Sequence, residues 1–233
     1  MKLLVIGSCT GKKDDAGCPN SAKLVESDFD DPIRLRSREA ELRNWLRPAG
    51  AMYTGRQHTQ MMQGLRLIRS TFGKDACTLT ILSAGYGLIP EDRLIAPYDI
   101  TFQGVPKPLV KARGEKLGVP SAIQKLVSDF PLVFFLLGDD YLRSARPPIV
   151  PTASQRFISF GSAKLRAAMR VVVIPTTDQM AQGVGDNPRT RKGRMFHLLA
   201  AGLQEEPSML EELYRDNTPE SVIRLMNSGK CLR

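Results

Sequence analysis

Short apolar segments alternate with segments of helical periodicity along this chain, and the alternation limits the possible folds more than any other feature. The expected strands are residues 2–7, 78–83, 132–137, 157–160 and 171–174. Helical periodicity predicts helices over 33–46, 57–72, 121–130, 191–203, 208–215 and 219–227, with a short basic helix between the last two strands. Strands that alternate with helices favour a parallel sheet. We therefore predict an α/β fold, with a mostly parallel Rossmann-like sheet of about five strands and helices on both faces.

The segment Leu132–Leu137 is a continuous apolar run between Pro131 and Gly138. A strand with no polar residue is typical of a strand covered on both faces, so we expect it at the centre of the sheet. The length of 233 residues suits one large α/β domain with a small appendage. We assign residues 1–203 to a nucleotide-binding-like α/β domain and 204–233 to a C-terminal helical extension.

The chain carries a formal net charge of +9. Such an excess favours anionic partners, so we expect a phosphate-bearing one, a nucleotide or nucleic acid. No apolar run approaches the roughly 20 residues that span a membrane. The N-terminus has the length of a first strand and lacks the features of a signal peptide. We therefore expect a cytoplasmic protein with no membrane partner, and the sequence leaves its oligomeric state open.

The cysteine and histidine content argues against a metal site. A structural zinc site needs four closely spaced ligands, and a cytosolic enzyme of this size rarely uses a disulfide framework. No cysteine pair forms a CxxC motif, and the complete set is Cys9, Cys18, Cys77, Cys231, His58 and His197. The adjacent acids Asp139 and Asp140 could hold Mg²⁺, but two adjacent acids alone do not define such a site. We expect neither a metal nor a cofactor.

The first expected strand runs into the polar loop Ser8–Lys13. Its spacing is that of neither a P-loop nor a GxGxxG motif. In an open α/β sheet, however, ligands bind beyond the carboxyl ends of the strands. The hydroxyls can bond phosphate oxygens, and a lysine supplies charge. The predicted ligand contacts are Ser8, Cys9, Thr10 and Lys12; the alternative is an ordinary turn with exposed lysines and a small buried cysteine.

The second expected strand ends in the turn Ser83–Gly87, whose glycines permit close backbone approach. Tyr86 could stack on a base. Asp92 and Asp99 are the acids nearest to this turn, and carboxylates serve acid–base chemistry and base or ribose recognition. The predicted catalytic residues are Asp99, Asp92 and Tyr86, and the predicted ligand contacts here are Ser83, Gly85, Gly87 and Tyr98. The alternative is that these acids are solvated or cap helices.

Three further segments carry candidate ligand contacts. Tyr53 and Gly55 precede the helix at 57–72, whose N-terminal amides favour an anion; His58 is either a general base or a surface residue. The central strand is followed by polar residues at the same edge of the sheet, and a basic loop precedes the helix at 191–203, where cations suit phosphate contacts. The candidates in these two segments are Asp139, Tyr141, Arg189 and Arg191. The alternative for the basic loop is a solvated, mobile segment.

The motifs in these loops resemble a family found in bacteria and phages that is distantly similar to the YaaA-like peroxide-stress proteins. The matching motifs are Ser8-Cys9-x-x-Lys12, Tyr53-x-Gly55, Ser83-Ala84-Gly85-Tyr86-Gly87-Leu88-Ile89 and Ile95-x-Pro97-Tyr98-Asp99-x-Thr101. The resemblance covers residues 1–105, with a weaker match at Gly138 and Tyr141. The chain differs from shorter members by an insertion over 14–50 and by its extended C-terminal third.

This resemblance implies a role in nucleic-acid or nucleobase metabolism. It also implies a pocket lined by Ser8, Cys9, Lys12, Tyr53, Ser83, Tyr86, Gly87, Tyr98 and Asp99.

Taken together, these features lead to two main hypotheses. The first is an enzyme, a glycosidase or glycosyltransferase, that cleaves or exchanges an N-glycosidic bond in a nucleotide or at a base in nucleic acid. A carboxylate, Asp99 or Asp92, would stabilise the cationic sugar or activate a water. The expected phosphate contacts are Lys12, Arg189 and Arg191, and the base would stack on Tyr86 or Tyr98. The second hypothesis is a non-catalytic nucleic-acid-binding or nucleotide-sensing module. A thiol-dependent enzyme that uses Cys9 is a third.

Overall fold

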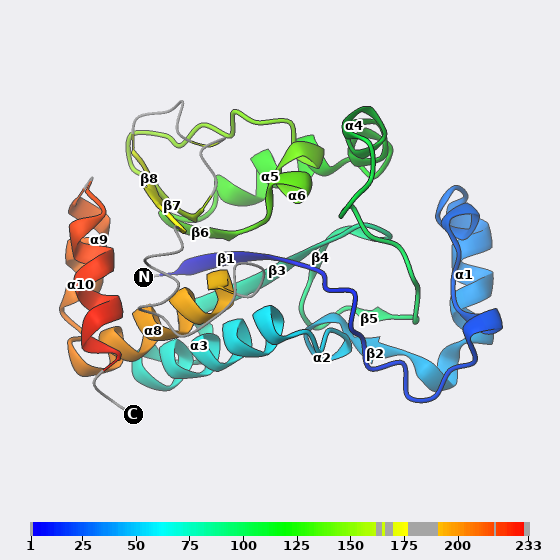
Figure 1. Cartoon of the computed structure of the whole chain (residues 1–233), viewed down its shortest axis with the longest axis horizontal. Helices are drawn as coiled ribbons and strands as arrows, with labels where there is room; N and C mark the ends of the chain where they lie inside the picture. The colour runs from blue at the N-terminus through cyan, green and yellow to red at the C-terminus, as the bar shows by residue number, and fades with distance from the viewer. Residues whose placement is uncertain (1, 162–164, 166–169, 177–190, 217, 231–233) are drawn as a thin grey trace.

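A six-stranded sheet with the strand order β4-β3-β1-β6-β7-β8 forms the centre of the molecule (Figure 1). The computed structural model describes residues 2–161, 165, 170–176, 191–216 and 218–230. The strands are β1 (Leu3–Ser8), β3 (Cys77–Ser83), β4 (Gly87–Pro90), β6 (Leu132–Leu136), β7 (Arg156–Phe160) and β8 (Val171–Ile174). Among the described strands of this sheet, β4 pairs antiparallel with β3, and the other neighbouring strands are parallel. The predicted α/β class and mostly parallel sheet are confirmed.

Helices cover both faces of this sheet. One face carries α3 (Arg56–Phe72) and α8 (Arg191–Glu205), and the other carries α4 (Lys107–Lys116), α5 (Val119–Val127) and α6 (Asp139–Ser144) (Figure 1). The remaining helices are α1 (Pro32–Glu41), α2 (Ala49–Met52), α9 (Met209–Arg215) and α10 (Glu220–Ser228). Single 3₁₀ turns occur at Asn20–Ala22, Glu26–Phe29, Arg43–Trp45 and Lys74–Ala76, and β2 (Arg47–Pro48) pairs with β5 (Leu94–Ile95).

The central strands β1 and β6 are buried along their whole length. This agrees with the expectation from the apolar run at 132–137, because a strand covered on both faces has no solvent-facing position. The same apolar core continues beyond residue 203, since Leu213, Val222 and Leu225 on α9 and α10 are fully buried in it. The C-terminal helices therefore pack on the α/β core through α8.

Two close approaches bring α8 against α3. A Cβ added at Gly193 would lie 2.0 Å from the carbonyl oxygen of Gln57, and one at Gly64 would lie 2.9 Å from the Phe196 ring. Any larger side chain at Gly193 would meet backbone that cannot move aside as a flexible side chain can. Glycine at this position therefore sets the separation of the two helices at the end where both begin.

Several elements differ from the sequence-based expectation. No strand or helix was expected between residues 84 and 120, but this segment turns back as β4 after Ser83 and later forms α4. Pro108 occupies the first turn of α4. Backbone N–H groups in a first turn have no partner within the helix, so the missing N–H of proline breaks no hydrogen bond there. The short α6 was also not predicted. The expected basic helix between β7 and β8 lies largely outside the described residues.

The strand order creates a switch point between β1 and β6. The chain passes from β1 through α3 to β3 on one side, and then crosses to β6 on the other side of β1. The loops after β1 and β6 lead to helices on opposite faces, which in α/β sheets opens a crevice at the carboxyl ends of these strands. The inserted segment packs over the same edge, where Leu24 donates its backbone N–H to Pro97 O at 2.9 Å.

Candidate functional site

The loops after β1 and β6 meet through Cys9 and Tyr141. The backbone N–H of Cys9 donates to Leu82 O at 3.0 Å, which fixes the loop against β3. The Sγ of Cys9 lies 3.0 Å from the hydroxyl oxygen of Tyr141 on α6, and both side chains are buried. Burial and negative charge at Cys9 raise the pKa of Tyr141, so its phenol stays protonated at neutral pH. The contact joins the two sides of the switch point.

A second buried chain of hydroxyls is centred on Tyr98. Its hydroxyl lies 2.7 Å from Ser83 Oγ and 2.8 Å from the hydroxyl of Tyr53. Ser83 Oγ accepts the backbone N–H groups of Gly85 and Tyr86 at 3.1 and 3.0 Å, which leaves its own proton available to Tyr98. Burial raises the pKa of Tyr98. The network therefore fixes the turn after β3 against the segment that carries Asp99.

Lys13 lies against this network, with its Nζ 4.5 Å from the centroid of the Tyr98 ring. Lys13 is half-buried, whereas Lys12 is exposed. Burial lowers the pKa of Lys13, and the charge of Lys23 acts in the same direction. Negative charge at Cys9 and at Asp99 opposes that shift, so both groups are close enough to act on the amine electrostatically. The two-lysine loop thus places one cation inside the site and one outside it.

An open cavity of about 560 Å³ adjoins this buried cluster. Asp99, Thr101 and Lys23 contribute polar groups to its wall, together with the inserted segment. Thr101 Oγ1 lies 3.5 Å from the hydroxyl of Tyr141 and so connects the cavity to the pair formed by Cys9 and Tyr141. Asp99 and Glu26 are the two exposed acids that line this cavity, and Glu26 is paired with Arg113.

Protein side chains cover the rings of Tyr86 and Tyr98. Phe29 packs edge-on against both, at centroid distances of 4.9 and 5.8 Å. Tyr86 also accepts the backbone N–H of Ala96 at 3.0 Å and has the guanidinium of Arg93 over its ring. The two tyrosines are 8% and 1% exposed. In this structure they shape the wall of the site and present no free face to a base.

The remaining residues of the first loop join the same edge. Thr10 Oγ1 accepts the backbone N–H of Gly55 at 3.3 Å and donates to Lys12 O at 2.9 Å. Ser8 Oγ accepts from Gln57 at 3.4 Å. Gly87 adopts a φ of 73°, which permits the turn into β4. The predicted residues that the structure gathers here are Ser8, Cys9, Thr10, Tyr53, Gly55, Ser83, Gly85, Tyr98, Asp99 and Tyr141.

The other predicted residues occupy different positions in the described structure. Asp92 is exposed beyond the end of β4 and lines a different cavity. Arg191 is buried at the start of α8 and donates to Thr176 O. Asp139 is exposed at the first position of α6, and its charge acts on Lys192, whose pKa burial lowers. Arg189 lies outside the described residues.

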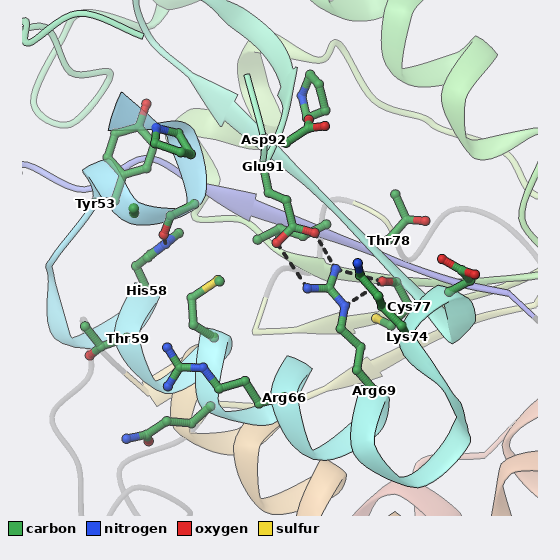
Figure 2. Close-up of a pocket in the computed structure, with 18 of the residues that line it drawn as sticks. Tyr53, His58, Thr59, Arg66, Arg69, Lys74, Cys77, Thr78, Glu91 and Asp92 are labelled. Atoms are coloured by element: carbon green, nitrogen blue, oxygen red, sulfur yellow. Dashed lines mark hydrogen bonds and ion pairs between the residues drawn. The ribbon is translucent and has the colours of Figure 1, made fainter. Parts of the chain in front are cut away.

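The other cavity, of about 1100 Å³, forms a groove beside α3 and over β3 and β4 (Figure 2). Arg69 bridges it, because its guanidinium pairs with Glu91 and donates to Cys77 O (Figure 2). The cations Lys2, Arg66 and Lys74 line the groove, as do the acids Asp75 and Asp92. Tyr53 and Thr54 form the end nearest to the buried hydroxyl network.

His58 also lines the groove, yet it is only 2% exposed. Its Nε2 lies 2.8 Å from Gly50 O, so the imidazole is an N–H donor there and holds α2 against α3. Burial lowers the pKa of His58, which favours this neutral form. The sequence left two alternatives for His58, a general base or a surface residue. His58 is buried and so is not a surface residue, and the contact with Gly50 gives it a role in packing.

Within the described ranges, no group of three or more His, Cys, Asp or Glu side chains is placed to hold a metal ion. No helix among these residues is long and apolar enough to cross a membrane. Comparison with protein-family models gives no match, and comparison with curated proteins gives no significant one. The resemblance to the bacterial and phage family therefore stays a prediction from the motifs.

Proposed function

We propose that this protein is an enzyme that acts on a nucleotide, or on a base in nucleic acid, by cleaving or exchanging an N-glycosidic bond. The observation that carries this proposal is the convergence of Asp99, Lys13 and the pair formed by Cys9 and Tyr141 on the crevice between β1 and β6. Nucleotide ligands of α/β sheets bind at such a switch point.

Asp99 is the proposed reactive carboxylate. It is exposed in a cavity of about 560 Å³, a volume in the range of small-molecule sites. In the cleavage of an N-glycosidic bond, positive charge develops on the sugar, and a fixed carboxylate stabilises that charge or activates a water.

Hydroxyl groups supply the remaining contacts of the proposed site. Thr101 faces the cavity, and its Oγ1 lies 3.5 Å from the protonated phenol of Tyr141. Such groups can both donate to and accept from a base edge or a ribose hydroxyl. Lys12, exposed at the end of the first loop, is the proposed phosphate contact.

A ligand screen with product detection tests the proposal. Purified protein is mixed with nucleosides, nucleotides, NAD and short DNA or RNA, and thermal unfolding and mass spectra are recorded. We expect stabilisation by a nucleotide-class compound together with a released base or an exchanged sugar. If only long polyanions stabilise the protein, if salt abolishes the effect and if no product forms, the protein is a binding module instead.

The groove beside α3 favours that second candidate function, sequence-independent binding of nucleic acid. Lys2, Arg66 and Lys74 line it, and the described residues include no ion-pair partner for any of them. A helix of 17 residues extends about 25 Å, enough for about seven stacked nucleotides at about 3.4 Å each. The salt dependence of binding measures this function separately from turnover.

A further inference from the structure

We propose that Lys13 is a covalent catalyst whose amine forms an imine with C1′ of the substrate sugar. This inference rests on the proposed function, because it specifies how the N-glycosidic bond would be broken. Lys13 and Lys23 are both half-buried at the site, while Lys12 is exposed. Lys23 is paired with Asp15 at 2.7 Å, which leaves Lys13 as the candidate amine.

The position of Lys13 meets the geometric needs of a nucleophilic amine. The Tyr98 ring supports its Nζ at 4.5 Å, and the antiparallel bridge to Tyr53 fixes its backbone. Tyr98 is itself held by Ser83 and Tyr53, so the surface beneath the amine is rigid. Asp99 follows Tyr98 in the chain and opens onto the cavity. Lys13 does not itself line that cavity, but its amine is close enough to Asp99 for the charge of the carboxylate to act on it. The proposal therefore requires the sugar bound at Asp99 to extend past the carboxylate toward Lys13.

The surroundings of Lys13 also favour the uncharged amine. An amine attacks only when unprotonated, and desolvation is one way in which proteins increase that fraction. Burial lowers the pKa of Lys13, and the charge of Lys23 adds to this effect, while negative charge at Cys9 and Asp99 limits it. The amine therefore carries a proton less often than an exposed lysine at the same pH.

The proposed reaction begins with the attack of the neutral Lys13 amine on the sugar. The Lys13 nitrogen forms a bond to C1′, and the C1′–N bond to the base breaks, so that its electron pair leaves with the base. The lysine nitrogen is positively charged once its bond to C1′ has formed, and it then gives a proton to the departing base. The nitrogen lone pair then forms C1′=N as the C1′–O4′ bond breaks, and O4′ takes a proton relayed by Asp99 from solvent. Addition of water to the iminium carbon returns the lysine and an aldehyde sugar.

Reduction with borohydride tests the proposal, because hydride converts the iminium to a stable secondary amine. The probes are ribose 5-phosphate and a short single-stranded oligodeoxynucleotide with one abasic site, since both present an aldehyde whatever base the enzyme prefers. Protein, probe and borohydride are incubated together, and peptide mass spectrometry locates the adduct. Lys13→Arg keeps the charge but removes the amine, and Lys125→Arg, at an exposed lysine of α5, is the matched control.

We expect an adduct on Lys13 in the wild type and in Lys125→Arg, and at least a tenfold loss of total adduct in Lys13→Arg. Peptide mapping of the wild type decides the question even if Lys13→Arg does not fold. An adduct spread over exposed lysines, including Lys12, overturns the proposal. Base release without an adduct on Lys13 overturns it but leaves the proposed function intact. An adduct on Lys13 without base release from any substrate supports the amine's reactivity and contradicts the proposed function.

Discussion

The Sγ of Cys9 lies 3.0 Å from the hydroxyl oxygen of Tyr141, although 132 positions separate the two residues in sequence. Cys9 follows β1 and Tyr141 follows β6, so the contact closes the crevice between the two strands at its floor. The cavity lined by Asp99 adjoins this contact through Thr101, whose Oγ1 lies 3.5 Å from the Tyr141 hydroxyl. The half-buried amine of Lys13 is close enough to Cys9 to interact with it electrostatically. The pair is the structural link between the fold and the proposed chemistry.

A double-mutant cycle measures how strongly this pair couples the two loops. We expect Cys9→Ala and Tyr141→Phe to be non-additive in the free energy of unfolding by about 0.5–1.5 kcal/mol, the usual net value of a hydrogen bond. Chemical denaturation of the two single variants and the double variant provides the measurement. Additive effects would mean that the thiol and the phenol do not stabilise each other.

The pH dependence of stability reports on Lys13. Burial lowers its pKa in the folded state below the usual 10.5, so the unfolded chain binds more protons between the two values. Stability contributed by this group therefore rises with pH through that interval, and the protonated lysine costs stability below it. We expect Lys13→Met to raise the melting temperature at pH 7 relative to the wild type, with a difference that shrinks toward pH 10.5. A difference that grows with pH would contradict this account.

The contact between α3 and α8 depends on the absence of a side chain at Gly193. A Cβ there would lie 2.0 Å from Gln57 O, so Gly193→Ala must push the helices apart. We expect a loss of about 1–3 kcal/mol in the free energy of unfolding, as for overpacked cores. Gly11 is a suitable control, because a Cβ there meets nothing within 4 Å. Equal stability of the Gly193→Ala and Gly11→Ala variants would show that the helices are less closely packed than described.

The salt dependence of nucleic-acid binding tests the groove beside α3. If the groove holds a phosphate backbone, Arg66→Ala and Lys74→Ala should each lower the slope of log K against log salt by about 1. Lys125→Ala, on the opposite face of the sheet, should leave the slope unchanged. Fluorescence anisotropy with a labelled single-stranded oligonucleotide at several salt concentrations gives the slopes. Equal slopes for all four proteins would place any nucleic-acid contact elsewhere.

Much of the fold could be predicted from hydrophobic periodicity. The run Leu132–Leu137 indicated a doubly covered strand, and β6 is buried throughout. Periodicity did not reveal β4, because it is four residues long and ends in Pro90, where a turn is the usual expectation. It also missed α4, since the prolines around Lys107 resemble a loop although one of them is tolerated in a first helical turn.

The site was harder to predict than the fold, because its residues meet only through tertiary contacts. The order of strands places Tyr141 beside Cys9, and the sequence does not state that order. The sequence alone does not distinguish the roles of Lys12 and Lys13. The structure does, because Lys13 forms the backbone bridge to Tyr53 and places its amine over the Tyr98 ring. Asp92 and Asp99 lie seven positions apart in sequence, yet they line different cavities.

Release of free base is the measurement that tests the central claim most directly. Mass spectrometry would quantify the base released from nucleosides, nucleotides and short DNA or RNA by the wild type and by Asp99→Asn. Asp129→Asn is the matched control, because Asp129 is an exposed acid in the turn before β6, at the opposite end of that strand from the proposed site. We predict release by the wild type and by the control, and a loss of about 10²-fold or more in Asp99→Asn. Full activity in Asp99→Asn would contradict the assigned role, and no release by the wild type from any of these compounds would contradict the proposed function.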